Sequence, residues 1–157
     1  MTTPAFDDRD GYIWLNGELQ PWRGAKAHVL THALHYASAV FEGERAYNGK
    51  VFKLEEHTDR LFYSAEVLDM KIPYERDVIN MATYEALSAN SIIDGYVRPI
   101  AWRGSELMGV SAQSTKINVA IAVWAWPSYF SPEARLKGIK LDISEWRRPS
   151  PETSPVF

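Results

Sequence analysis

Residues 28–47 hold the side chains best suited to binding a small molecule. Gly43 interrupts an otherwise regular strand pattern, and a missing side chain there indicates close approach of a ligand or of another backbone. Two rings, Tyr36 and Phe41, and one cation, Arg45, lie close to it in sequence. Since small-ligand sites join apolar walls to a few polar groups, these four residues form a candidate pocket.

Other polar residues point to chemistry less directly. Tyr96 and Arg98 share one face of a predicted strand, although an ion pair across the sheet is an alternative role for Arg98. Arg60 falls within a predicted helix, where its position alone predicts a solvated surface arginine. His32 and His35 are three residues apart, but no third metal ligand is evident, so packed histidines are favoured over a metal site.

Two β-hairpins are predicted at the start of the domain that must position these residues. Asn16-Gly17 separates strands expected over 12–15 and 18–22, and Asn48-Gly49 separates strands expected over 39–47 and 50–54. Asn-Gly suits a type I′ turn, because both central positions of that turn need a positive φ. An antiparallel sheet is therefore expected.

Two amphipathic helices and two longer strands complete this domain. Apolar residues spaced three and four apart predict helices over 55–70 and 75–89. Residues 96–103 alternate in polarity, and Pro99 within them indicates an edge strand or a bulge. Residues 117–126 are nearly all apolar, which predicts a strand buried on both faces. The class is therefore α+β, with an antiparallel-rich sheet and two helices.

The chain is expected to contain one complete domain and the opening of another. The small N-terminal domain spans residues 1–126, a linker rich in proline and serine spans 127–136, and a second domain begins over 137–157. A strand is expected over 139–145, but a single strand has no core of its own. The second domain is therefore interpreted as truncated.

Composition excludes several functional classes. The 157 residues carry a net charge of -3, so binding to nucleic acid is not expected. The absence of cysteine excludes disulfides and thiolate metal sites. No secretory leader is visible in the first ten residues, and the longest apolar run is too short to span a membrane. A cytoplasmic protein without a membrane anchor is expected.

Five ordered motifs carry a family resemblance that covers about residues 12–155. The run from His32 to Arg45, with its Val-Phe-Glu-Gly-x-Arg end, resembles the signature of branched-chain amino-acid aminotransferases, which are pyridoxal-phosphate enzymes of fold type IV. Four further segments are similar to the family's in the same order: His57-Thr58-Asp59-Arg60-Leu61, Tyr96-Val97-Arg98-Pro99, Met108-Gly109-Val110 and Trp126-Pro127-Ser128-Tyr129.

The resemblance implies roles for individual residues. Arg60 would bind the phosphate of pyridoxal 5'-phosphate, because a guanidinium forms short bidentate bonds with phosphate. Phe41, Gly43 and Tyr96 would line the substrate pocket, with Tyr96 offering its hydroxyl to the substrate carboxylate. Arg98 would meet the side-chain carboxylate of glutamate.

Further implied roles involve a second subunit and a second domain. Arg45 would lie near the substrate pocket in a less defined role. Tyr36 and Val110 would reach the active site of the neighbouring subunit, so the family implies a homodimer or a higher homo-oligomer. Trp126 and Tyr129 would belong to an interdomain loop that covers the substrate.

The catalytic residue implied by the family is absent from these residues. The Schiff-base lysine is expected just beyond Phe157, and the lysines present are interpreted as surface residues. Either that lysine carries covalent cofactor and so is not written as a standard residue, which we favour, or the 157 residues are a fragment that is inactive alone. Glu44 also departs from the family, since many relatives have an aliphatic residue there.

The resemblance implies transamination of branched-chain L-amino acids, namely leucine, isoleucine and valine, with 2-oxoglutarate. Its alternatives within fold type IV are a D-amino-acid or (R)-amine transaminase and an aminodeoxychorismate lyase. An alternative of another class is an inactive fragment that acts as an assembly module. The Val-Phe-Glu-Gly-x-Arg and Tyr-x-Arg-Pro segments favour the branched-chain group.

Overall fold

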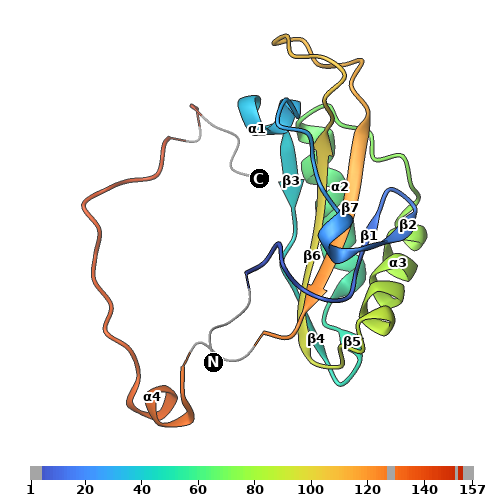
Figure 1. Cartoon of the computed structure of the whole chain (residues 1–157). Helices are drawn as coiled ribbons and strands as arrows, with labels where there is room; N and C mark the ends of the chain where they lie inside the picture. The colour runs from blue at the N-terminus through green and yellow to red at the C-terminus, as the bar shows by residue number, and fades with distance from the viewer. Residues whose placement is uncertain (1–4, 127–129, 151, 154–157) are drawn as a thin grey trace. The chain divides into compact units, whose positions relative to one another are not determined.

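The structure, a computed structural model, describes residues 5–126, 130–150 and 152–153. The chain divides into two units, residues 1–126 and 127–157. The first unit is a seven-stranded antiparallel sheet whose one face is covered by two long helices (Figure 1). The α+β class expected from the sequence is therefore confirmed.

The sheet is built around its two longest strands, which pair with each other along their whole length. Its order is β2-β1-β7-β6-β4-β5, and β3 pairs with β6 on the same side as β4. The strands are β1 (Tyr12–Leu15), β2 (Glu18–Pro21), β3 (Ala39–Phe41), β4 (Glu44–Tyr47), β5 (Lys50–Val51), β6 (Gly95–Arg103) and β7 (Ile117–Trp124).

Both predicted hairpins form with the expected turn residues. Asn16 and Gly17 have φ values of 51° and 105°, and Asn48 and Gly49 have values of 49° and 74°. Positive φ at both central positions is what a type I′ turn requires. Each turn joins strands that pair directly, β1 with β2 and β4 with β5.

The strand expected over residues 39–47 is divided into β3 and β4. Phe41 pairs with Ile100, and Glu44 pairs with Val97, three positions further along both strands. The register is therefore the same on both sides of the break, and the chain contains no extra residue there.

Pro99 lies opposite this break and explains it. The Glu42 amide donates to the Pro99 carbonyl over 3.0 Å, but Pro99 has no N–H with which to return the bond. On its other side Pro99 pairs with Ile121 of β7, so it occupies a central strand. The expectation of an edge or a bulge was wrong, because the sheet accommodates Pro99 by leaving out part of one ladder.

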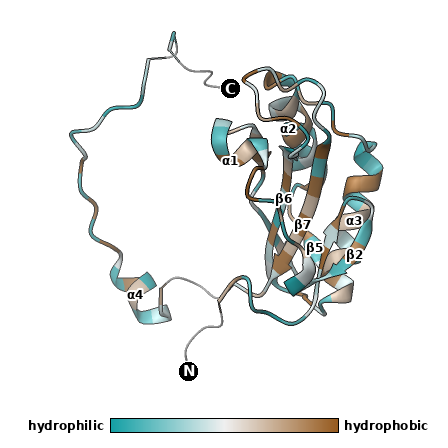
Figure 2. Ribbon diagram, turned by 45° about the horizontal axis from the view of Figure 1, so that its top comes forward, coloured by the Kyte–Doolittle hydropathy of each residue, from teal (hydrophilic) through white to brown (hydrophobic). Residues whose placement is uncertain are grey.

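The helices cover one face of the sheet and enclose a single core. They are α2 (Leu54–Val67) and α3 (Arg76–Ala89), accompanied by the short η1 (Trp22–Gly24) and α1 (His32–Tyr36). The fully buried side chains include Leu61 and Ile79 from the helices and Val97, Val119 and Ile121 from the sheet. Figure 2 shows the apolar residues concentrated along β6 and β7, under these helices.

The strand β7 is fully buried on its helix-covered face only. Val119, Ile121 and Val123 are buried there, whereas Ala122 and Trp124 on the opposite face are partly exposed. The expectation of burial on both faces is therefore not met within this unit. This second face is only partly covered, with Ala120 buried and the Phe6 ring against Trp124, and it is called the open face below.

The described part of the second unit contains one short helix, α4 (Pro132–Lys137), where a linker was expected. Its first turn is capped by Ser131, whose hydroxyl accepts a hydrogen bond from the Ala134 amide over 3.2 Å. The strand expected over 139–145 is absent, and Leu141 and Ile143 are exposed. A strand needs a partner, and none is present in the described part of this unit. No helix in the described ranges has the length and apolarity to cross a membrane.

Glu44 is an ionisable residue inside the core of the first unit. It is 2% exposed, and neither carboxylate oxygen has a hydrogen-bond partner among the described residues. Burial, with a smaller contribution from the nearby charge of Glu42, raises the pKa of Glu44 to about 8. Glu44 therefore carries a proton at neutral pH in the folded protein.

Replacing Glu44 with glutamine is expected to remove a pH dependence of stability. Between the ordinary pKa of 4.5 and about 8, the folded state holds a proton that the unfolded state has released. The free energy of unfolding should therefore fall as pH rises, by about 2 kcal/mol between about pH 6 and pH 8. Urea unfolding across this range should show the fall in the wild type and in Glu85→Gln, an exposed control, but not in Glu44→Gln. Equal slopes in all three proteins would contradict the assignment.

Candidate functional site

The open sheet face carries a cluster of aromatic rings and an arginine. The Tyr96 ring centroid lies 4.8 Å from that of Trp126 and 4.9 Å from that of Trp124. The Arg98 guanidinium lies 4.3 Å from the Phe41 ring centroid and donates a 2.8 Å hydrogen bond to the Tyr96 hydroxyl. The Tyr96–Arg98 pair expected from alternation therefore shares one face, and Phe41 and Trp126 join it.

Gly43 provides the space that the Tyr96 hydroxyl occupies. A Cβ atom on Gly43 would lie 2.4 Å from the Tyr96 hydroxyl oxygen and 3.2 Å from its Cζ. Its φ lies outside the left-handed region, so glycine is needed here for close approach and not for backbone conformation. The group that approaches it is a side chain, where the sequence indicated a ligand or a backbone.

Arg45 lies beside this cluster on β4, opposite Tyr96 in the ladder. Its Nη2 donates a 2.8 Å hydrogen bond to the Trp126 carbonyl, and its guanidinium lies 5.8 Å from the Tyr47 ring centroid. Arg45 therefore holds the end of the first unit against the cluster. Five of the predicted site residues thus lie on the same face as Gly43: Phe41, Arg45, Tyr96, Arg98 and Trp126.

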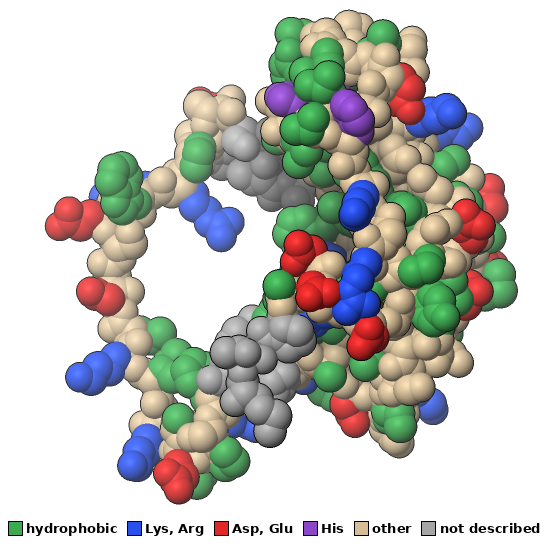
Figure 3. Space-filling view, viewed as in Figure 1, with side chains coloured by type: hydrophobic (Ala, Val, Ile, Leu, Met, Phe, Trp, Pro, Cys, Tyr) green, Lys and Arg blue, Asp and Glu red, His purple; other side chains and the backbone are tan. Residues whose placement is uncertain are grey.

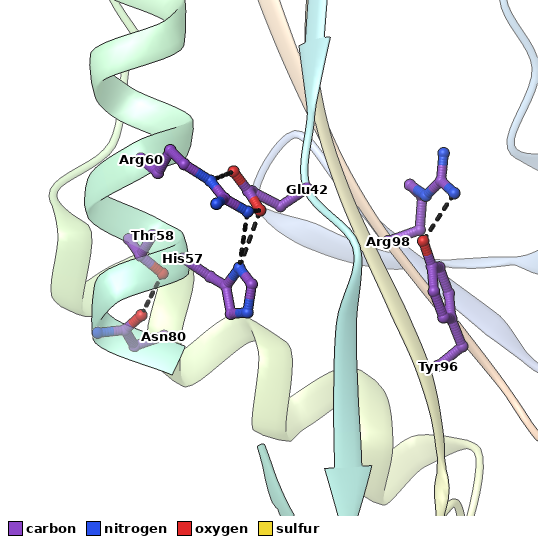
Figure 4. A network of polar contacts seen from close by, with 7 residues as sticks. All are labelled: Glu42, His57, Thr58, Arg60, Asn80, Tyr96 and Arg98. Carbon is purple, nitrogen blue, oxygen red and sulfur yellow. Dashed lines mark hydrogen bonds and ion pairs between the residues drawn. The ribbon is translucent and has the colours of Figure 1, made fainter. Parts of the chain in front are cut away.

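Arg60 belongs to a second polar group, which lies on the helix-covered face. Its Nε and Nη2 each donate a 2.6 Å hydrogen bond to a different carboxylate oxygen of Glu42. His57 Nδ1 lies 2.9 Å from Glu42 Oε2. Figure 4 shows this group and the Tyr96–Arg98 pair on either side of the chain that runs from β3 to β4.

The electrostatics of this second group keep its carboxylate ionised. Burial alone would raise the pKa of Glu42, but hydrogen bonds from Arg60 and His57 outweigh burial and hold that pKa below its usual range. The Glu42 side chain is 5% exposed, whereas that of Arg60 is 63% exposed. Glu42 occupies two of the five guanidinium N–H groups, and Arg60 Nη2 also lies 3.4 Å from His57 Nδ1. The two N–H groups of Nη1 remain for an anion such as phosphate.

Tyr36 and Val110 lie away from both groups, near the opposite end of β6. The Tyr36 hydroxyl donates to the Met108 carbonyl over 3.3 Å, and Val110 is 85% exposed. Figure 3 shows hydrophobic side chains and histidines gathered over α1, at the end of the sheet where Tyr36 lies. The first unit therefore does not bring these two residues to the Tyr96 cluster.

His32 is a packed histidine of the kind favoured by the sequence. It is buried, its Nδ1 lies 2.7 Å from the Ser38 hydroxyl, and its Nε2 lies 3.0 Å from the Gly109 carbonyl. Both ring nitrogens are therefore engaged. His35 Nε2 is similarly placed, 3.0 Å from the Val29 carbonyl.

Sequence reasoning did not single out Glu42, His57 or Trp124. Glu42 and His57 lie within the quoted motifs, and alternation backwards from Trp126 places Trp124 on its face. No sequence signal shows that Glu42 faces Arg60, because their contact depends on how α2 packs against the sheet. Tyr129 lies outside the described residues.

Comparison with known proteins gives a family match over most of the chain. The sequence model of the family described as Amino-transferase class IV matches residues 39–156. The chain belongs to this family. It is 50% identical over 145 residues to the branched-chain-amino-acid aminotransferase of Pseudomonas aeruginosa, covering 90% of this chain and 47% of that protein. Identity with the Escherichia coli K12 branched-chain-amino-acid aminotransferase is 37% over 161 residues, covering 99% of this chain and 51% of that protein.

Solved structures of class IV relatives share the fold. The T.th. branched-chain amino acid aminotransferase with pyridoxamine 5'-phosphate superposes with a TM-score of 0.87 at 39% identity, over 94% of this chain and 50% of that chain. The Escherichia coli enzyme gives a TM-score of 0.83 at 34% identity, again over 94% and 50%. The expected N-terminal part of a fold-type-IV enzyme is confirmed, and the chain spans about half the length of these relatives.

Adding one methyl group at Gly43 is expected to disturb the aromatic cluster. In Gly43→Ala the new Cβ displaces the Tyr96 hydroxyl, which changes the packing of Tyr96 against Trp124 and Trp126. Near-ultraviolet circular dichroism should change while the far-ultraviolet spectrum is retained. Gly24→Ala is the matched control, because its new Cβ meets no atom within 4 Å. Identical near-ultraviolet spectra for both variants would show that Gly43 has no such role.

Proposed function

We propose that this chain is the N-terminal part of a pyridoxal-phosphate-dependent aminotransferase that acts on branched-chain L-amino acids with 2-oxoglutarate. The observation that carries the proposal is the open-face cluster of Phe41, Gly43, Tyr96 and Arg98, which unites the two motifs that favour the branched-chain group. The names of the Pseudomonas and Escherichia relatives support the same substrate class.

Arg60 is the residue of this chain proposed to hold the cofactor. Its mostly exposed side chain leaves the two N–H groups of Nη1 beyond the contacts with Glu42 and His57, which suits the phosphate of pyridoxal phosphate. When bound, that cofactor supplies the carbonyl that takes up the amino group of the substrate. The lysine that holds it is proposed to come from outside these 157 residues, since the relatives are about twice as long.

The Tyr96 hydroxyl is proposed to bind a substrate carboxylate. Its oxygen accepts a hydrogen bond from Arg98, so its own proton is free to be donated elsewhere. The Arg98 charge also polarises the hydroxyl, which makes it a stronger donor to an anionic oxygen. Gly43 keeps this position open by lacking a side chain.

A transaminase pocket must accept an aliphatic side chain in one half-reaction and that of glutamate in the other. Phe41 and, from a neighbouring subunit, Tyr36 and Val110 are proposed to form the apolar wall. Arg98 is proposed to meet the second carboxylate of glutamate, and its guanidinium lies over the Phe41 ring. The Phe41 ring and the hydrogen bond to Tyr96 stabilise the guanidinium in part without an anionic partner, although its buried Nε has no hydrogen-bond partner among the described residues.

The first test is an absorption spectrum of the full-length protein purified with pyridoxal phosphate. We expect a visible band of bound cofactor that is lost on adding L-leucine and restored by 2-oxoglutarate. Arg60→Ala should need a much higher cofactor concentration for the same band, about tenfold or more, because charged hydrogen bonds are lost. Absence of the band at any cofactor concentration would refute the proposal. Faster turnover of D-alanine than of L-leucine would favour the D-amino-acid alternative.

Replacing Arg98 with glutamine is expected to separate the two half-reactions. Glutamine keeps a polar side chain but has no charge for the second carboxylate of glutamate. We expect KM for glutamate and 2-oxoglutarate to rise about tenfold or more. KM for L-leucine should rise by a clearly smaller factor, because only the polarisation of Tyr96 is lost for that substrate. Arg76→Gln, whose arginine pairs with Asp59 on the helices, serves as the control. An equal loss with both substrates would show that Arg98 does not select between them.

A further inference from the structure

Glu42 has an unusual relation to the residue that it contacts. It is a buried carboxylate, yet its partner Arg60 is mostly exposed. It receives hydrogen bonds from Arg60 Nε and Nη2 and lies within bonding distance of His57 Nδ1. The pair therefore anchors one edge of the guanidinium to the core while the rest of the Arg60 side chain stays exposed.

The two hydrogen bonds determine how the guanidinium is oriented. Because they run side by side from Nε and Nη2, they fix both the plane of the guanidinium and its rotation within that plane. The remaining three N–H groups then point away from Glu42. An arginine without this contact would populate many rotamers, and ordering them on binding an anion costs free energy.

Both sides of the contact are fixed to the rest of the fold. The Glu42 amide is bound to the Pro99 carbonyl of the central strand β6 over 3.0 Å. On the helix side, the Thr58 hydroxyl donates a 2.6 Å hydrogen bond to Asn80 Oδ1, which links the first turns of α2 to α3 (Figure 4). His57 and Arg60 lie in this same region of α2. Glu42 therefore positions Arg60 relative to the whole sheet.

The charge of Glu42 has an opposing effect. A carboxylate 2.6 Å from the guanidinium nitrogens neutralises the positive charge and repels a second anion. If Glu42 acted mainly as a counter-ion, its removal would strengthen phosphate binding. If it acted mainly by orienting Arg60, its removal would weaken phosphate binding. The two roles therefore predict changes of opposite sign.

We propose that Glu42, supported by His57, is a positioning residue that presets Arg60 for the phosphate group of the cofactor. This inference rests on the proposed function, in which Arg60 takes that phosphate. Glu42 itself touches neither cofactor nor substrate, and its effect passes through Arg60. Preorganisation outweighs charge neutralisation here because the guanidinium is already aligned while most of the Arg60 side chain stays exposed.

The test measures how much the phosphate group contributes to binding. The full-length protein, freed of cofactor, is titrated with pyridoxamine 5'-phosphate and with pyridoxamine, which lacks the phosphate. Neither ligand has an aldehyde that could react with a lysine. Glu42→Gln is expected to lower the affinity for pyridoxamine 5'-phosphate about tenfold and to change the affinity for pyridoxamine less than about twofold. Glu56→Gln, which removes the exposed Lys53 contact on the same helix, should leave both affinities unchanged.

The outcomes separate the inference from the function on which it rests. If the wild-type protein binds both ligands equally, the role of Arg60 fails. If the wild type prefers the phosphorylated ligand but Glu42→Gln binds it as well or better, only the positioning role is overturned. An equal loss for both ligands would mean a general structural role and would also overturn it.

Two further variants protect the test against misfolding and indirect effects. In an Arg60→Ala background, Glu42→Gln should produce no additional loss, because the residue through which it acts is gone. His57→Ala leaves the carboxylate in place and removes one supporting contact. It should therefore also lower the affinity for pyridoxamine 5'-phosphate, by a smaller factor than Glu42→Gln does. An unchanged affinity would contradict the support assigned to His57.

Discussion

The register that β3 and β4 share against β6, kept across the break opposite Pro99, determines how the candidate site is arranged. Pro99 accepts a hydrogen bond from the Glu42 amide but has no N–H to return, so β3 ends and β4 begins opposite it without a change of register. Preserved register keeps the alternation of side chains across the break. Phe41 and Gly43 therefore lie on the open face, while Glu42 lies on the helix-covered face. The two sides of the site thus follow from the alternation that the chain keeps across the break.

Local chemistry made much of this fold predictable. The Asn-Gly turns specify their own φ values, and the apolar spacing of α2 and α3 reflects a helix that buries one side. Features that depend on a distant partner were not predictable in this way. The break opposite Pro99 requires knowledge of which strand lies beside β6, and the missing strand over 139–145 reflects the absence of any neighbour in the described part of its unit.

The same distinction between local features and distant contacts applies to the candidate site. Alternation along β6 was enough to place Tyr96 and Arg98 together, because period two holds for any strand. The partner of Arg60 was not predictable, since Glu42 lies 18 residues away and meets it only through packing of α2 on the sheet. Glu44 illustrates the same limit: its type suggests a surface residue, whereas its register with Val97 directs it into the core.

The hydrogen bond from Arg45 to the Trp126 carbonyl has a mechanical consequence. Trp126 is the last residue of the first unit, and its carbonyl is held by a side chain of β4, inside the sheet. The chain therefore leaves the sheet from a point that is fixed to a second strand. Tension applied to the segment that follows would be transmitted first to Arg45 and from there to the strand that carries it, before it reached the end of β7.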